Sequence, residues 1–176
     1  MTAERSKTNR TAQRAVYDVV VLGGGAAGLF AAFTAAQRGR RVLVLERANK
    51  IGKKILMSGG GRCNFTNLYI EAQNFLSANQ HFCKSALSQY TQWDFIDLMQ
   101  RHGLEYEERK HGQLFCLHSA KDIVAMLKTE CDLSGVEIET HCEINKVGSS
   151  TSHSHDNRYH IELAQGSSEP RKTLML

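Results

Sequence analysis

One segment, residues 17–46, constrains the fold of this chain more than any other. Residues 17–22 form an apolar run rich in valine, which is typical of a parallel strand with both faces covered. Three glycines follow in the spacing G-x-G-x-x-G, and a second apolar run occupies residues 42–45. This order of strand, glycine turn, helix and strand predicts the first βαβ unit of an α/β dinucleotide-binding domain with a parallel sheet.

Each glycine of the turn has its own physical task. Gly23 allows a tight turn out of the strand, and Gly25 lacks the Cβ atom that would keep a pyrophosphate away from the backbone. Gly28 lets the helix pack closely against the sheet. At the start of the helix, Ala26 and Ala27 offer backbone N–H groups and the positive end of the helix dipole to phosphates.

Glu46 follows the second apolar run and lies 18 residues after Gly28. A carboxylate at this place can accept hydrogen bonds from a ribose diol, so the site suits FAD or NAD better than NADP. The spacing alone does not separate FAD from NAD. A purely structural βαβ unit without a ligand is the alternative at this point.

The rest of the chain predicts further elements. We expect a disordered tail over residues 1–15, a long functional or mobile connection over 47–68, and helices within 74–102 and from Ser119 to Gly135. We expect short strands within 104–117, with a turn at Gly112, and further strands at 136–140, 144–147, 159–163 and from residue 173. A chain that stops on an apolar run indicates a truncated protein.

Charge and cysteine usage exclude several classes of function. The net charge of +4 divides into +3 over residues 1–15, +7 over residues 38–62 and −6 elsewhere. The basic residues therefore lie beside the predicted phosphate site, without the interleaved aromatics of a nucleic-acid surface, so we expect no nucleic-acid partner. The apolar runs are too short to span a membrane. Five cysteines without a C-x-x-C pair argue against disulfides and metal sites, and we expect reduced thiols and a cytoplasmic protein.

Two blocks of sequence carry a family resemblance. The glycine turn together with Ala32, Gly39, Val42 and Glu46 resembles the FAD fingerprint of two-dinucleotide-binding-domain flavoproteins. Residues 52–67, GKKILMSGGGRCNFTN, resemble the G-G-R-C-N-x-T-N segment of the YhiN/BaiN-like NAD(P)/FAD-dependent oxidoreductases. A third stretch, HGQLFCLHS, departs from the family's G-x-x-F-P-x-S pattern because a cysteine replaces the proline.

The resemblance implies FAD as the cofactor and a Rossmann-like FAD-binding domain with a parallel sheet and an added antiparallel β-meander. Residues 16–176 would form the N-terminal part of that domain, without the substrate domain. Implied cofactor-binding residues are Gly23, Gly25, Ala26, Ala27, Gly28, Glu46, Arg47, Lys54, Ser58, Gly59, Gly60, Arg62, Cys63, Asn64 and Val147. The glycines of the second block would bring backbone N–H groups to the cofactor, and the basic residues would balance the diphosphate charge.

The resemblance also implies an enzyme. We expect a flavoprotein oxidoreductase that takes reducing equivalents from NAD(P)H and reduces a small organic acceptor, for example at an activated C=C bond. No catalytic side chain stands out, and a packing role is expected for Cys63 rather than a redox role. The alternatives are a non-catalytic flavin- or nucleotide-binding module, an NAD-binding dehydrogenase domain, and a flavin-dependent RNA-modifying enzyme, which would need a basic surface.

Overall fold

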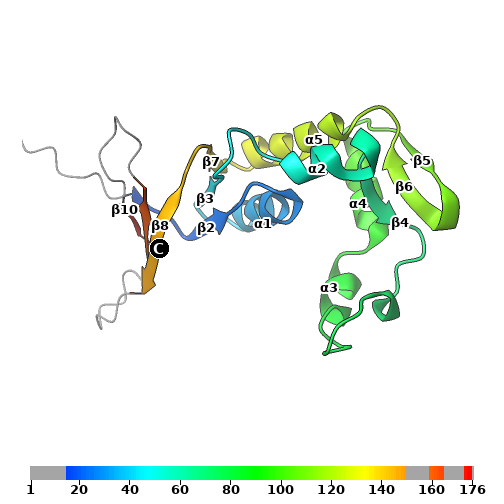
Figure 1. The fold of residues 1–176 in the computed structure, drawn as a ribbon, viewed down its shortest axis with the longest axis horizontal. Coiled ribbons are helices and arrows are strands. Elements are labelled where there is room, and N and C mark those ends of the chain that lie inside the picture. The colour runs from blue at the N-terminus through cyan, green and yellow to red at the C-terminus, as the bar shows by residue number, and fades with distance from the viewer. Residues whose placement is uncertain (1–14, 150–158, 165–172, 176) are drawn as a thin grey trace, which may run out of the picture.

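The computed structural model describes residues 15–149, 159–164 and 173–175, and a parallel sheet lies at its centre (Figure 1). This sheet has the order β2-β3-β7, formed by β2 (Val19–Leu22), β3 (Val42–Leu45) and β7 (Glu137–Glu139). Both pairings are parallel. All four residues of β3 are buried, as expected for a strand that is covered on both faces.

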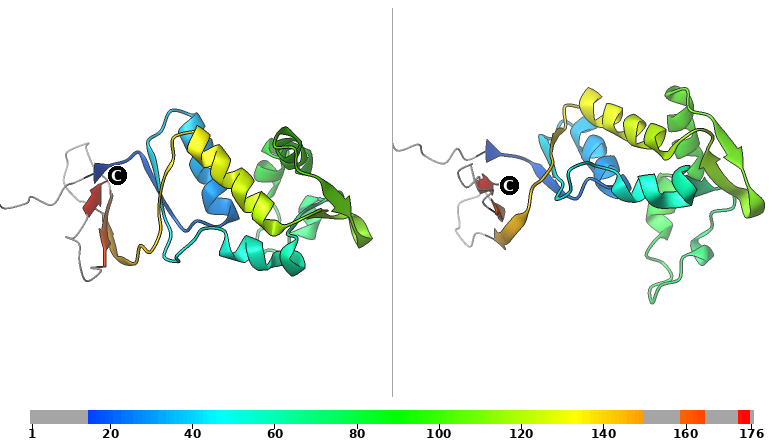
Figure 2. Two further views of the ribbon diagram at one scale, coloured as in Figure 1. Left: turned by 90° about the horizontal axis from the view of Figure 1, so that it is seen from above. Right: turned by 45° about the horizontal axis from the view of Figure 1, so that its top comes forward.

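Two helices cover one face of this sheet. The helices α1 (Ala26–Gln37) and α5 (Ala120–Leu133) lie side by side (Figure 2) and enclose Val42 and Val44 of β3 in the main core. Gly39, with φ of +77°, lies just beyond the end of α1, in the left-handed conformation that ends many helices. The side chain of Ser119 accepts a hydrogen bond from the N–H of Lys121 at 3.1 Å, which confirms the predicted start of α5.

A second sheet packs against the other face of β3. Its order is β1-β10-β9-β8, with β1 (Ala15–Val16), β10 (Thr173–Met175), β9 (Tyr159–Leu163) and β8 (Ile144–Ser149). Strands β8, β9 and β10 pair antiparallel in succession, and β1 is parallel to β10. Leu43 and Leu45 of β3 form a small core with Ile161 of β9. The predicted fold class, a Rossmann-like domain with a parallel sheet and an antiparallel meander, is therefore confirmed.

A third sheet lies at the far end of the helices (Figure 1). Its order is β4-β6-β5, with β4 (Asn64–Asn67), β6 (Gln113–Cys116) and β5 (Tyr106–Glu108), and all pairings are antiparallel. The short 3-10 segment η3 (Lys110–Gly112) joins β5 to β6. The helix α4 (Gln92–Arg101) packs on β4, and the segment with η2 (Ala72–Asn74) and α3 (Lys84–Gln89) extends away from the body.

Three expectations about the elements are wrong in part. The run at 17–22 is not one strand, because Asp18 bonds to the backbone N–H of Arg41 at 2.7 Å and the chain breaks there into β1 and β2, which join different sheets. The connection 47–68 is not a loop, because it contains α2 (Lys53–Met57), the 3-10 segment η1 (Ser58–Gly61) and β4. The range 74–102 is not helical from its start, because its first α-helix, α3, begins only at Lys84 and residues 75–83 lie before it.

Some expectations fall on parts of the chain that are not described. Residues 1–14 of the predicted tail lie outside the described residues, while Ala15 belongs to β1. Leu176, the last residue of the strand expected from residue 173, also lies outside them. In the described ranges, no group of three or more His, Cys, Asp or Glu side chains could hold a metal ion. A search of the same ranges finds no helix with the length and apolar character needed to cross a membrane.

Candidate cofactor site

The glycine turn between β2 and α1 has the geometry of a phosphate-binding turn. Gly23 has φ of +108°, and its N–H donates to the carbonyl oxygen of Leu45 at the end of β3, at 2.8 Å. Gly25 is the N-cap of α1 in an extended conformation, and no side chain caps the helix. The first turn of α1 carries no acidic residue, and Ala26 and Ala27 are exposed. Its N–H groups are therefore open to an anion.

The space around this turn fits a diphosphate. A Cβ atom on Gly25 would meet no other atom within 4 Å, so the backbone faces open space where a phosphate could approach. A Cβ atom on Gly28 would instead lie 2.0 Å from the carbonyl oxygen of Gly23. Gly25 thus leaves room for a ligand, and Gly28 allows α1 to pack closely against the turn.

Glu46 is fixed by the backbone on both sides. Its Oε1 atom accepts from the N–H of Ala48 and its Oε2 atom from the N–H of Gly24, both at 2.7 Å. The N–H of Ala48, then that of Gly24 and the charge of Lys53, lower the pKa of Glu46 and outweigh the opposing effect of burial. The carboxylate is therefore ionised and oriented, and its remaining lone pairs can accept ribose hydroxyl groups.

The second glycine block is joined directly to the first. The N–H of Gly52 donates to the carbonyl oxygen of Gly24 at 2.8 Å, and Gly52, with φ of +71°, is the N-cap of α2. Ile51 packs on Gly24 so closely that a Cβ atom there would lie 2.7 Å from Ile51 Cγ2. Lys53 and Lys54 at the start of α2 are exposed. We call these two joined segments, residues 23–28 and 46–54, the cradle.

Beyond α2, three successive glycines turn the chain back toward β4. Gly59, Gly60 and Gly61 all have positive φ, at 57°, 65° and 86°. A Cβ atom on Gly59 would lie 2.7 Å from the ring of Phe115, so its lack of a side chain is a packing requirement. A Cβ atom on Gly60 would meet nothing within 4 Å, which leaves its backbone open. Ser58 donates its hydroxyl to the carbonyl oxygen of Ile55 at 2.8 Å and stabilises the turn.

The remaining residues of this block are engaged within the protein. Arg62 Nη1 lies 3.3 Å from Glu107 Oε1 in an exposed ion pair. Cys63 is buried with φ of +55°, and burial raises the pKa of its thiol, in keeping with a packing role. The amide of Asn64, in the orientation that satisfies its neighbours, donates to the carbonyl oxygens of Leu114 and Thr66 at 3.1 and 3.0 Å. Cofactor contacts by these side chains stay a prediction.

Only part of the basic segment 38–62 lies beside the predicted phosphate site, where all of it was expected. Arg38, Arg40 and Arg41 precede β3, at the end opposite Glu46. Arg41 pairs there with Glu137 at 3.2 Å and lies over the ring of Tyr17. The second group, which follows β3, belongs to the cradle and is exposed: Arg47, Lys50, Lys53 and Lys54. Because β3 separates the two groups, only the second lies at the end of the strand where the glycine turn is found.

The structure adds residues that sequence reasoning missed. The N–H of Cys142 donates to the carbonyl oxygen of Glu46, and the N–H of His141 to that of Ala48, both at 3.0 Å. These two hydrogen bonds connect the segment that precedes β8 to residues 46 and 48 of the cradle. Val147 lies further along β8, in the four-stranded sheet, with its side chain 51% exposed, and its predicted contact with the cofactor stays a prediction. No local pattern could have identified contacts between segments so distant in sequence.

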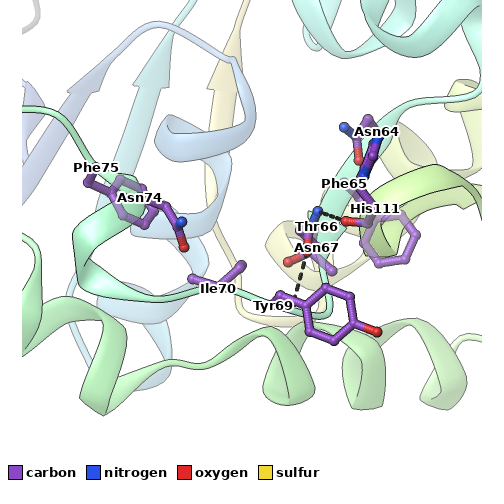
Figure 3. A pocket seen from close by; sticks show the side chains of 9 residues that line it. All are labelled: Asn64, Phe65, Thr66, Asn67, Tyr69, Ile70, Asn74, Phe75 and His111. Atoms are coloured by element: carbon purple, nitrogen blue, oxygen red, sulfur yellow. Dashed lines mark hydrogen bonds between the residues drawn. The ribbon is translucent and has the colours of Figure 1, made fainter.

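A hollow of about 540 Å³ lies along β4 and the chain that follows it (Figure 3). Its lining joins aromatic residues with asparagines and a threonine: Asn64, Phe65, Thr66, Asn67, Tyr69, Ile70, Asn74, Phe75 and His111. Asn64 directly follows the glycine turn of residues 58–63, so the hollow begins where the second glycine block ends.

Comparison with known proteins gives consistent matches. A family model described as the HI0933-like protein Rossmann domain matches residues 17–175. The chain is 53% identical over 131 residues to the ribosomal RNA dihydrouridine synthase of Escherichia coli. The aligned region covers 74% of this chain and 33% of that protein. It is 31% identical over 130 residues to the 3-dehydro-bile acid delta(4,6)-reductase of Clostridium scindens, covering 72% and 32%.

Among solved structures, the 3-ketosteroid-delta4-(5alpha)-dehydrogenase of Rhodococcus jostii RHA1 superposes with a TM-score of 0.63 at 18% identity. The match covers 97% of this chain and 46% of that one, and it concerns the fold alone. The chain spans about a third of the length of the two curated relatives.

Proposed function

The chain belongs to the HI0933-like family of FAD-binding Rossmann domains, as its resemblance to YhiN/BaiN-like proteins predicted, and from this premise we propose an NAD(P)H-dependent flavoprotein reductase. Bound FAD supplies hydride transfer between the donor and an organic acceptor. The chain's own residues bind and orient the cofactor. The single observation that carries the proposal is the joined cradle, with open space at Gly25 and an oriented carboxylate at Glu46.

The cradle assigns a task to each part of its surface. The N–H groups at the start of α1 would hold the diphosphate, and Lys53 and Lys54 would balance its charge. Glu46 would accept the hydroxyl groups of a ribose. The open backbone at Gly60 would approach the cofactor on the side of the third sheet. These assignments favour an FAD-binding enzyme over an NAD-binding dehydrogenase domain, because the second glycine block serves an extended cofactor.

The names of the two relatives indicate the chemical class of the electron acceptor. One relative is named for making dihydrouridine in ribosomal RNA, and the other for a delta(4,6)-reduction of a bile acid. Dihydrouridine is uridine with its conjugated C5=C6 bond reduced, so both names concern the activated C=C bonds expected from the sequence. We propose a uridine in RNA, because that relative is 53% identical and the other 31%. This proposal replaces the expectation that the protein has no nucleic-acid partner.

The direct experiment uses the full-length protein loaded with FAD. It is incubated with NADPH or NADH and with ribosomal RNA from cells that lack the gene, and dihydrouridine is measured by mass spectrometry of nucleosides. A 3-oxo steroid with a conjugated C=C bond serves as the competing acceptor. We expect dihydrouridine in the RNA and no reduction of the steroid. Reduction of the steroid alone would favour the bile-acid type of acceptor, and FAD binding without turnover of either acceptor would favour the non-catalytic module.

Two further assignments belong to this proposal. We infer that residues 16–176 form the N-terminal part of an FAD-binding domain, and that the protein works in the cytoplasm. Cys63, Cys83, Cys116 and Cys131 are free thiols, which suits a reducing compartment. Fractionation of cells that produce the full-length protein tests the location.

A further inference from the structure

An exposed tyrosine on the rim of the hollow has a fixed position. Tyr69 is 68% exposed, and its N–H donates to Asn67 Oδ1 at 2.8 Å. The Asn67 Nδ2 atom in turn donates to the carbonyl oxygen of His111 at 2.8 Å. The N–H of Leu68 donates to the carbonyl oxygen of Gly112, also at 2.8 Å. The backbone that leads into Tyr69 is thus held to the β5–β6 turn through Asn67 and Leu68.

The ring of Tyr69 is also packed from one side. A Cβ atom on Gly112 would lie 2.6 Å from the ring atom Cδ2, so the ring rests directly on the backbone of this glycine. Gly112 has φ of +72° and is buried. A glycine at this place therefore allows both the turn and the close approach of the ring. The result is an aromatic ring that packs against Gly112 through its Cδ2 and Cε2 atoms and is largely open to solvent.

The rest of the hollow offers groups that suit a flat polar ring. Phe75, 46% exposed, stands across the hollow from Tyr69 (Figure 3). The Asn74 Oδ1 atom accepts from the N–H of Glu71 at 2.9 Å, while its Nδ2 atom has no hydrogen bond to any described residue. The side chain of Thr66 also lines the hollow. An amide donor in a hollow lined by aromatic rings can bind a ring that carries carbonyl groups.

We infer that this hollow binds the nucleobase of the RNA substrate, with the ring of Tyr69 as its stacking face; this inference rests on the proposed function. Proteins that read unpaired RNA stack bases on aromatic side chains and bond their polar edges. The free amide donor of Asn74 suits a carbonyl oxygen of uracil. Asn64, the first residue of β4, lines the hollow and directly follows the glycine turn of residues 58–63, so a bound base lies next to the segment assigned to the cofactor.

The test compares three variants of the FAD-loaded full-length protein. Tyr69→Ala removes the stacking face, Tyr69→Phe keeps the ring, and Trp93→Ala removes an aromatic side chain that is 55% exposed on α4 and does not line the hollow. Dihydrouridine formation is measured against RNA concentration, together with the FAD content of each protein. We expect Tyr69→Ala to raise KM for RNA roughly 5- to 100-fold, as loss of one stacked base does. Tyr69→Phe should restore KM, and Trp93→Ala should match the wild type.

The outcomes separate this inference from the proposed function. If the wild type forms dihydrouridine and Tyr69→Ala has an unchanged KM and normal FAD content, the base does not stack on Tyr69 and the inference is wrong. If the wild type forms none, the proposed function fails, and binding of an oligouridylate decides the inference. Binding that Tyr69→Ala weakens and Tyr69→Phe restores would support the hollow as a base site. Oligouridylate binding that is the same in the wild type and in Tyr69→Ala, or no binding at all, would overturn the inference.

Discussion

The backbone N–H of Gly52 donates a 2.8 Å hydrogen bond to the carbonyl oxygen of Gly24. Gly24 precedes the N-cap of α1, and Gly52 is itself the N-cap of α2, so both helices begin from the same point. The two glycine-rich segments of the sequence therefore form one structural unit. Changes in either segment should affect both the fold of this unit and its capacity to bind FAD.

Gly25→Val should abolish FAD retention without unfolding the protein. The φ and ψ angles of Gly25, −84° and −176°, are allowed for valine, and a Cβ atom there meets no protein atom within 4 Å. The side chain would occupy the space assigned to the pyrophosphate. FAD content and thermal melting are measured together, with Ala31→Val on the exposed side of α1 as the matched control. Normal FAD content in Gly25→Val would contradict the assignment of the turn.

Gly28→Ala should have the opposite profile, with damage to the fold itself. Its new Cβ atom would lie 2.0 Å from the carbonyl oxygen of Gly23, so α1 must move away from the turn. Overpacking of this kind costs roughly 1–3 kcal/mol of the free energy of unfolding. Urea denaturation of the cofactor-free protein measures the loss. A stability equal to that of Gly25→Val would show that the helix is not packed as closely as described.

Glu46→Gln should destabilise the cofactor-free protein at neutral pH but not in acid. Hydrogen bonds from Ala48 and Gly24 lower the pKa of Glu46 from its ordinary value of 4.5, so the folded state binds this proton less readily than the unfolded state. The contribution of the carboxylate is therefore complete well above pH 4.5 and is lost as the pH falls through the lowered pKa. Because the two hydrogen bonds go to a charged acceptor, we expect the substitution to lower the free energy of unfolding by about 1–3 kcal/mol at pH 7.

The measurement compares wild type and Glu46→Gln by urea denaturation from pH 7 down to a pH below the lowered pKa of Glu46. The difference in the free energy of unfolding should shrink as the pH falls. A difference that stays constant, or grows in acid, would show that the two backbone bonds do not favour the ionised form.

Gly52→Ala should be rescued in part by Val124→Ala. A Cβ atom on Gly52 would lie 2.6 Å from Val124 Cγ2 and 2.9 Å from Cγ1, in addition to the cost of alanine at φ of +71°. The steric part disappears when Val124 is shortened, whereas the backbone part of about 1–2 kcal/mol remains. A double-mutant cycle of unfolding free energies should give a coupling of about 1 kcal/mol or more. Strictly additive effects would place α2 away from α5.

The sequence predicted the parts of the fold whose signals are local. The apolar run 42–45 became the buried strand β3, and the helix expected from Ser119 became α5. The βαβ unit, the class of fold and the family were predicted from glycine spacing and short motifs. These features depend on residues within one or two turns of chain, which is why they are visible in the sequence.

The parts that sequence reasoning missed depend on contacts between distant segments. Asp18 separates β1 from β2 only because Arg41 lies beside it. The basic residues near Arg41 and those near Lys53 are close in sequence, yet β3 places them at opposite ends of the sheet. The hollow beside Tyr69 needs Gly112 from another strand connection. Each of these relationships arises only when separate elements pack together.

The most direct test of the account is the identity of the cofactor that the full-length protein retains. The protein is purified without added nucleotide, its absorption spectrum is recorded, and the compound released by heat is identified by chromatography. The cradle of residues 23–28 and 46–54 predicts a yellow protein that releases stoichiometric FAD, and a colourless Gly25→Val variant. A colourless wild-type protein that binds NADH instead would contradict the account.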